Sequence, residues 1–187
     1  MKLALSGDPN SFSHEAGELY RTAHELALDQ VEYIFATDSA GALAALTAGK
    51  ADKAIMPIHN ITGGLVQMTL EAMGKYTFKV EEWFGLSVQQ CFMVKPGVEP
   101  NALTLVVSHD QGLRQCQNYL ETTWPNLEQK AYPDTALAAH DLAAGTLPST
   151  SAVIASRMAA QYYNLQLLGE SIQDNSDNQT TFIVVSL

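Results

Sequence analysis

The sequence predicts an α/β fold made of two lobes, each with a mainly parallel sheet covered by helices on both faces. Short apolar runs of strand length alternate with segments of helical periodicity along the whole chain, which is typical of βαβ units. The pattern changes near residue 78, where the extended segments Lys79–Leu86 and Ser87–Val94 follow one another directly. At 187 residues, of which 47% are hydrophobic, the chain is long enough to bury a core in each lobe.

The first 78 residues are predicted to alternate three strands with three helices. Strands are expected at Lys2–Leu5, Val31–Thr37 and Lys53–Ile58. Helices are expected up to about Leu28, up to Gly49, and from about Gly64 to Met73. Ser11 or Ser13 is placed to cap the first helix and Asp38 or Ser39 the second, because such side chains accept from free N–H groups of a first turn.

The rest of the chain continues the alternation. After the two extended segments, strands are expected at Leu103–Val107, Glu128–Tyr132, Ala152–Ala155, Leu165–Leu168 and Phe182–Leu187. Helices are expected from Gln111 until Trp124, from Asp134 or Thr135 to Gly145, and through Tyr163. No Pro-, Gly- or Ser-rich linker separates the two halves, so no flexible tether is expected between the lobes.

The stretch Met56–Val66 carries the strongest functional pattern. An apolar strand ends in Pro-Ile-His-Asn-Ile-Thr-Gly-Gly before helical periodicity resumes. Gly63 and Gly64 let a ligand approach the backbone closely, and a helix start there would favour an anion by about 0.3–2 kcal/mol. We expect a small dianionic acid to bind over this turn, with His59 taking part in its chemistry. The alternative is a tight strand–helix turn with a surface histidine.

Composition excludes several classes of protein. The net charge is −10 and the ten Lys and Arg residues are spread singly, so no nucleic-acid partner is expected. No run of 18 apolar residues occurs, which predicts no transmembrane helix and no membrane partner. Cys91 and Cys116 lie in apolar patterns and indicate buried thiols in a reducing cytoplasm.

Cofactor and metal sites have no sequence support. The chain lacks a Walker loop, a dinucleotide Gly-x-Gly-x-x-Gly and any Cys/His cluster with ligand spacing, so neither a cofactor nor a metal is expected. Because the protein is acidic, an anionic substrate would be repelled at long range and must be captured by local dipoles and a few cations. Arg114 and Arg157, near helix starts, are the best candidates to hold a carboxylate bidentately.

A set of motifs along the chain, several of them at polar turns where a strand gives way to a helix, resembles in its order a known family. The motifs are Gly7-Asp8-Pro9-Asn10-Ser11-Phe12-Ser13, Met56-Pro57-Ile58-His59-Asn60, Ser108-His109-Asp110-Gln111 with Gln115-Cys116, Asp134-Thr135-Ala136, Ile154-Ala155-Ser156, and Ile172-Gln173-Asp174 with Asn178-Gln179-Thr180-Thr181-Phe182. They are similar, in order and spacing over essentially the whole chain, to motifs of prephenate dehydratase catalytic domains.

The resemblance implies a fold of two Rossmann-like lobes, like type II periplasmic binding proteins, with prephenate bound in the cleft between them. One catalytic domain would span 1–187, with lobe 1 at about 1–78 plus 168–187 and lobe 2 at about 79–167. We expect neither an ACT nor a chorismate mutase domain, and the family suggests a homodimer. The resemblance implies that the substrate site contains Asn60, Gln111, Gln115 and Thr180.

Three positions depart from the family pattern. The family's glutamate is His59 here, its following serine is Ile61, and the arginine of its Thr-Arg-Phe is Thr181. Similar changes occur in non-aromatising prephenate decarboxylases of antibiotic and secondary metabolism. Our leading hypothesis is therefore a carbon–carbon lyase that removes CO₂ from prephenate, protonates the ring and retains the 4-hydroxyl, giving dihydro-4-hydroxyphenylpyruvate.

In this hypothesis His59 and Thr180 are catalytic. The expected substrate-binding residues are Ser11, Asn60, Thr62, Gly63, Gly64, Gln111, Arg114, Gln115 and Thr181. His59 would supply the ring proton, since histidine is the side chain most often used as a general acid in enzymes. One alternative is a diverged prephenate dehydratase that forms phenylpyruvate. A second is a non-catalytic binding protein for a small dicarboxylic acid.

Overall fold

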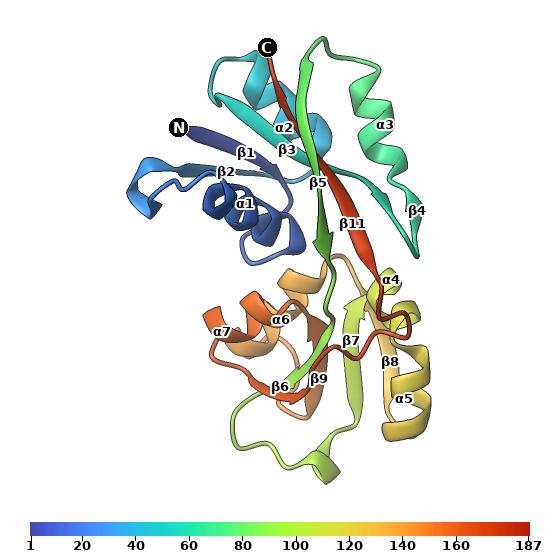
Figure 1. The fold of residues 1–187 in the computed structure, drawn as a ribbon. Coiled ribbons are helices and arrows are strands. Elements are labelled where there is room, and N and C mark those ends of the chain that lie inside the picture. The colour runs from blue at the N-terminus through green and yellow to red at the C-terminus, as the bar shows by residue number, and fades with distance from the viewer. The chain divides into compact units, whose positions relative to one another are not determined.

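The computed structural model describes residues 1–187 and divides the chain into two compact units. The first unit comprises Met1–Ser87 and Gln179–Leu187, and the second comprises Val88–Asn178. Each unit has its own mixed sheet with helices packed on it (Figure 1). The predicted α/β class with two sheet-containing lobes is therefore confirmed, whereas the expectation of mainly parallel sheets is wrong, since at least half of the strand pairs in each sheet are antiparallel.

The first unit contains a five-strand path with one additional short strand. Its elements are β1 (Lys2–Ser6), α1 (Phe12–Ala23), β2 (Glu32–Ala36), α2 (Ser39–Thr47), β3 (Lys53–Asn60), β4 (Gly64–Leu65), α3 (Gln67–Met73), β5 (Lys79–Ser87) and β11 (Gln179–Ser186). The strand order is β2-β1-β3-β11-β5, with β4 paired to β3. β1 is parallel to β2 and β3, whereas β11 is antiparallel to β3 and β5.

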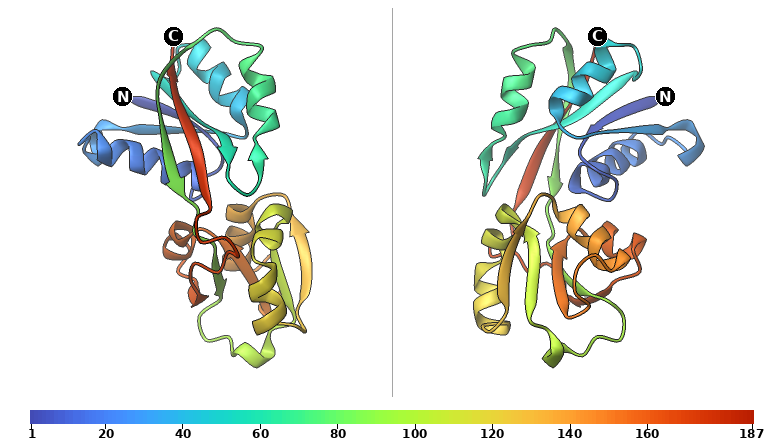
Figure 2. Two further views of the ribbon diagram at one scale, coloured as in Figure 1. Left: turned by 45° about the vertical axis from the view of Figure 1, so that its right-hand side comes forward. Right: turned by 180° about the vertical axis from the view of Figure 1, so that it is seen from behind.

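The sheet of the first unit is covered on both faces (Figure 2). Alternate residues of β11 point to the two sides: Phe182 and Val184 pack with residues of α1, and Ile183 and Val185 pack with residues of α2. This period of two is the geometry of an extended strand. Successive residues of β11 therefore lie alternately on the face covered by α1 (the α1 face) and on the face covered by α2 (the α2 face).

The second unit contains a five-stranded sheet. Its elements are β6 (Cys91–Val94), β7 (Leu105–His109), α4 (Asp110–Gln115), α5 (Gln117–Thr123), β8 (Glu128–Tyr132), α6 (Thr135–Ala144), β9 (Ser151–Ala155), α7 (Arg157–Tyr162) and β10 (Gln166–Gly169). The order is β10-β6-β9-β7-β8. β7 is parallel to β8 and β9, and β6 is antiparallel to β9 and β10.

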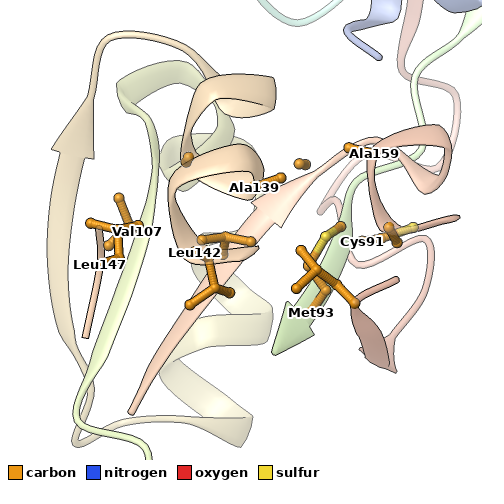
Figure 3. Packing of buried hydrophobic residues seen from close by; sticks show 12 residues of the cluster. Cys91, Met93, Val107, Ala139, Leu142, Leu147 and Ala159 are labelled. Carbon is orange, nitrogen blue, oxygen red and sulfur yellow. The ribbon is translucent and has the colours of Figure 1, made fainter. Parts of the chain in front are cut away.

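Two apolar clusters hold the second unit together. The first packs Met93, Val107 and Leu142 between the sheet and the helices α6 and α7 (Figure 3). The other packs Phe92 and Ile154 on the opposite side of the sheet with residues of α4 and α5. The two cysteines are both fully buried, one in each cluster, and form no disulfide, as predicted. Burial raises the pKa of the Cys116 thiol well above its ordinary value.

Several predicted boundaries differ from the structure. The first helix ends at Ala23 rather than near residue 28, and Glu25 then adopts a left-handed φ of 54° that no helix continues. The helix expected after Gln111 is two short helices separated at Cys116. The units divide at residues 87/88 and 178/179 rather than at 78/79 and 167/168, because β5 and β11 pair along almost their entire length.

The turn after β3 also differs from the prediction, and this correction affects the site. β3 continues to Asn60, and the chain then reverses so that β4 pairs with β3 (Figure 1). Gly64 supports the reversal with a φ of 77°, which favours glycine. Helix α3 begins only at Gln67, so Gly63 and Gly64 lie in a hairpin and not at a helix N-terminus.

No helix in the structure is both long enough and apolar enough to span a membrane.

Candidate functional site

The parallel strands of the first unit end at one edge of its sheet. β1 lies between β2 and β3, and the helices that follow β1 and β2 pack on opposite faces. In open α/β sheets such a point, beyond the carboxyl ends of the strands, is where ligands bind. Asn60 ends β3 at this edge, and Thr180 pairs with it from the beginning of β11.

The Asn60 side chain is fixed in one orientation. Its Oδ1 accepts from the backbone N–H of Thr62 at 3.0 Å and of Gly63 at 2.7 Å. Its Nδ2 therefore faces the other way and donates to Thr180 Oγ1 at 2.9 Å and to the Gln179 carbonyl at 3.2 Å. Asn60 is 6% exposed and Thr180 is 9% exposed. Because the Thr180 oxygen accepts from Asn60, its own O–H can donate to another group.

His59 and Thr181 are cross-strand partners on the other face of the sheet. The register pairs Thr181 with His59 and Thr180 with Asn60. Alternation along β11 places Thr180 on the face of Phe182, covered by α1, and Thr181 on the face of Ile183, covered by α2. The structure thus brings Asn60 and Thr180 together by a hydrogen bond and groups His59 with Thr181 instead.

The loop after β1 forms a second part of the same edge. Ser11 caps α1 by accepting from the His14 N–H at 3.4 Å, as its position in the sequence predicts. Asn10 adopts a left-handed φ of 67° and donates its N–H to His14 Nδ1 at 3.0 Å. That bond assigns the His14 proton to Nε2 in the neutral ring. Burial lowers the pKa of His14, with the nearby Glu18 carboxylate acting in the opposite direction.

The predicted site residues of the second unit lie on α4, after the carboxyl end of β7. Gln111 donates its backbone N–H to His109 Nδ1 at 3.2 Å. Arg114 forms an ion pair with Asp110, and the arginine side chain is 69% exposed. Arg157, on α7, pairs with Glu170 across side chains that are both near half exposed. Each arginine therefore has a surface carboxylate partner, an arrangement that contributes only about 0–1 kcal/mol to stability.

Gln115 is the buried member of this group, at 7% exposure, and its side-chain oxygen accepts two hydrogen bonds. Its Oε1 accepts from Gln90 Nε2 at 3.1 Å and from Asn178 Nδ2 at 3.2 Å. Sequence reasoning missed Gln90 entirely and treated Asn178 only as part of a polar turn. The partners lie 25 and 63 residues from Gln115 in the sequence, so no local sequence pattern predicts these contacts.

Comparisons with known proteins identify the family that the sequence motifs resemble. The prephenate dehydratase family model matches residues 3–187. Arogenate dehydratase 1 of Petunia hybrida is 33% identical over all 187 residues of this chain, which cover 42% of that relative. Arogenate dehydratase/prephenate dehydratase 6, chloroplastic, of Arabidopsis thaliana is also 33% identical, with all of this chain and 43% of the relative covered. The chain thus spans less than half the length of these curated relatives.

Solved structures give the same result. The prephenate dehydratase of Arthrobacter aurescens in complex with L-Phe superposes with a TM-score of 0.89 at 26% identity, covering 100% of this chain and 60% of that one. The prephenate dehydratase of Staphylococcus aureus has a TM-score of 0.79 at 16% identity, with 100% and 66% covered, and supports the fold.

The names of the relatives separate the predicted activities. Those described above are dehydratases, and none of their names refers to a non-aromatising decarboxylase, an antibiotic or secondary metabolism. The Arabidopsis relative is described as chloroplastic, whereas the sequence predicted a cytoplasmic location. The comparison therefore favours the alternative of a dehydratase over the leading hypothesis of the sequence analysis.

Proposed function

Because the chain belongs to the prephenate dehydratase family, we propose that it is a lyase that removes CO₂ and the ring hydroxyl from prephenate or arogenate. The observation that carries the proposal is the oriented pair of Asn60 and Thr180. Two backbone N–H groups hold the Asn60 amide, and that amide holds the Thr180 hydroxyl as an acceptor. The Thr180 proton is then directed away from Asn60, as a donor for a ligand.

The reaction needs such a donor. Loss of CO₂ from the quaternary ring carbon sends an electron pair through the cyclohexadiene ring and breaks the bond to the hydroxyl on the opposite ring carbon. The departing oxygen takes up a proton and leaves as water, and the ring becomes aromatic. In the proposed mechanism Thr180 donates its hydrogen bond to that oxygen as negative charge develops on it. A positioned donor of this kind contributes about 10²–10⁴ in rate.

Binding of the dianionic substrate is proposed to rest on neutral donors from the remaining predicted residues. Ser11, Thr62 and the backbone of Gly63 would serve in the first unit, and Gln111 and Gln115 in the second. The surface pairing of Arg114 and Arg157 supports a minor part for both arginines. Hydrogen bonds to a charged group contribute about 1.5–3 kcal/mol each, so a few of them suffice for binding without a buried cation.

A second candidate is the non-aromatising decarboxylase, and one observation favours it: the departures at His59, Ile61 and Thr181. In that reaction the ring takes up a proton after CO₂ leaves and the hydroxyl stays. His59 would supply the proton, and the product would serve secondary metabolism. Thr181 and Gly64 would then assist His59, from the facing and neighbouring strands.

The strand register favours the dehydratase over this candidate. The family's glutamate and arginine fall at the two positions occupied here by His59 and Thr181, which face each other across β3 and β11. Opposite charges at such positions form a cross-strand ion pair. Replacing both members removes one negative and one positive side chain together from the α2 face, so the net charge there does not change. The hydrogen bond between Asn60 and Thr180 stays intact. The departures are therefore explained without a change of reaction.

Product analysis tests the proposal. The purified protein is incubated with prephenate and, separately, with arogenate, and the ring is followed by NMR and ultraviolet absorption. Phenylpyruvate or phenylalanine supports the dehydratase. A non-aromatic product that retains the hydroxyl supports the decarboxylase and overturns the first proposal. Binding without turnover, measured by calorimetry, supports the alternative of a binding protein for a small dicarboxylic acid.

A further inference from the structure

We infer that Gln90 and Asn178 are positioning residues that hold the Gln115 amide with its oxygen inward, so that Gln115 meets the substrate only as a hydrogen-bond donor. This inference rests on the proposed function, in which Gln115 binds the anionic substrate. Its basis is a buried cluster of three amides: Gln90 is 3% exposed, Gln115 is 7% exposed and Asn178 is 1% exposed.

The cluster lies at the ligand-binding edge of the second unit's sheet. Cys91, at the start of β6, pairs with Ala155, the last residue of β9. Gln90 therefore precedes β6 at the edge where the parallel strands β7, β8 and β9 end, which is where open α/β sheets bind ligands. Gln115 ends the helix that directly follows β7.

Hydrogen bonds of the backbone fix the positions of the cluster residues. Ile172 donates its N–H to the Gln90 carbonyl at 3.0 Å, and Gln90 donates its N–H to Gln173 Oε1 at 3.0 Å. Asp174 donates its N–H to the Gln115 carbonyl at 2.7 Å. A single segment, 172–174, therefore places both glutamines. Asn178 is placed separately, since its carbonyl accepts from the Val88 N–H at 2.8 Å.

A side-chain amide can turn by 180°, which exchanges the positions of its oxygen and its nitrogen. The hydrogen bonds of the cluster favour one of these two orientations, or flip states, for its amides. Gln115 Oε1 receives two N–H donors, which occupy both of its lone pairs. If Gln115 alone turned, its NH₂ group would lie against the NH₂ groups of Gln90 and Asn178, and no hydrogen bond could form. Turning all three amides would place the Gln90 NH₂ where its Oε1 now lies, buried and without a partner. That state would replace a buried oxygen without a partner by a buried NH₂ without a partner, and buried unpaired N–H donors are rarer in proteins than under-satisfied carbonyl oxygens, so the observed orientation is favoured.

The locked state makes Gln115 selective for acceptors. With its oxygen saturated, only its N–H groups can meet a ligand, and a carboxylate or keto oxygen accepts from them. An amide without these two partners could also present its oxygen, which would repel a carboxylate or keto oxygen. The lock therefore acts through affinity rather than through the reacting atoms, and its loss is expected in KM and not in kcat.

Two substitutions at Gln90 separate positioning from packing. Gln90→Met removes the donor but keeps the volume, and should raise KM for the accepted substrate about fivefold to tenfold with kcat within twofold, the equivalent of one neutral hydrogen bond. Gln90→His retains an N–H at the same reach and should restore KM to within twofold of the wild type. Gln89→Met, at an exposed neighbouring position, is the control and should leave both constants unchanged.

The two Gln90 variants should rank in the opposite order in stability: the variant with the poorer KM should be the more stable one. Gln90→Met removes a buried oxygen that has no partner, so its Tm should equal or exceed that of the wild type, whereas Gln90→His should not exceed it. A merely structural residue would make the less stable variant the poorer enzyme. If KM is unchanged in Gln90→Met, or rises equally in Gln90→His, the inference is overturned while the proposed function stands.

Asn178→Asp forces the other flip state. The aspartate keeps the shape but offers only acceptors, so Gln115 must turn its NH₂ inward and present its oxygen to the substrate. KM should rise at least tenfold. Asn175→Asp is the control for charge: it is three residues away, exposed, and keeps the acceptor that now binds the Asp177 N–H. An equal effect of both variants would contradict the inference.

A measurement without substrate distinguishes failure of the lock from failure of the proposed function. In the ligand-free protein, the Gln90 side-chain amide protons should exchange slowly with solvent by NMR, and Gln115→Met should abolish that protection. Rapid exchange in the wild type overturns the inference. Slow exchange in a protein that turns over neither prephenate nor arogenate supports the lock and refutes only the function.

Discussion

The two units each hold a side-chain amide by its carbonyl oxygen, but they hold it by different means. In the first unit, Asn60 Oδ1 accepts from backbone N–H groups two and three residues further along the chain. In the second unit, Gln115 Oε1 accepts from the side chains of Gln90 and Asn178, which are 25 and 63 residues away. One amide is held by a local turn and the other by tertiary structure.

The difference has consequences for both function and mutation. The backbone donors around Asn60 persist whatever side chains the neighbouring residues carry, so this orientation is robust to substitution. The side-chain donors around Gln115 are each lost by a single substitution. The robust amide contacts Thr180, the proposed donor to the leaving oxygen, whereas the vulnerable one is proposed to affect affinity. The chain thus uses local structure where the reaction is proposed to occur.

The largest expected effect is at Thr180. Thr180→Val keeps the shape of the side chain but removes the hydroxyl, so the leaving oxygen loses its donor. We expect kcat to fall by about 10²–10⁴ with a much smaller change in KM. Steady-state kinetics with the accepted substrate provide the measurement. Thr180→Ser is the matched control, because it retains the hydroxyl and should keep at least a tenth of the activity. A Thr180→Val protein within threefold of the wild type would exclude this role.

Asn60→Asp should have the next largest effect. The aspartate still accepts from the Thr62 and Gly63 N–H groups, so the turn and the Tm should be largely retained. It cannot donate to Thr180, and the hydroxyl would instead donate to the new carboxylate. We expect kcat to fall about tenfold to a hundredfold, the equivalent of one to two hydrogen bonds. Unaltered kcat would show that the orientation of Thr180 does not depend on Asn60.

The same change of amide to acid in the second unit should act on a different constant. Gln115→Glu keeps an oxygen for the N–H groups of Gln90 and Asn178 but loses the donor to the substrate. We expect KM to rise about tenfold, with kcat less affected than in Asn60→Asp. If both acid variants change kcat and KM in equal proportion, the proposed division between the two units is wrong.

How much the sequence predicts follows the same local and non-local division. The polar turn at Asn60 and the caps of α1 and α6 were predicted, because each depends on residues within three positions. The helix start at Gly64 was wrong, because a two-residue strand that pairs back on β3 has no periodicity to detect. Gln90 was missed since its partner lies on a different element. The face on which His59 lies depends on the register with β11, which a single sequence does not reveal.

A smaller effect is expected in the pH dependence of stability. Burial holds the folded-state pKa of His14 below its ordinary value of about 6.5. Above that pH both folded and unfolded states are neutral and His14 makes no difference. As the pH falls below about 6.5, the unfolded state takes up the proton first, so stability declines until the folded-state pKa is passed. Thermal unfolding between pH 7 and 5 should show a decline in Tm that is smaller in His14→Gln. An identical decline in both proteins would exclude His14 as its source.

The smallest catalytic effect is expected at His59, which shares the α2 face with Thr181 and not the face of Thr180. His59→Ala should leave kcat within about threefold of the wild type, well short of the 10²–10⁴ that general acid catalysis contributes. A fall of tenfold or more would restore ring protonation by His59 and favour the decarboxylase.

The same pair of positions allows the opposite test, in which the family residues are put back. His59→Glu, Thr181→Arg and the double variant form a double-mutant cycle across β3 and β11. If the family pattern is a cross-strand ion pair, the double variant should be more stable than the sum of the single changes by about 0.2–1 kcal/mol. Urea denaturation measures this coupling. The double variant should also form the same product as the wild type, because both changes lie away from the Asn60 and Thr180 face. A switch of product would show instead that these two positions select the reaction.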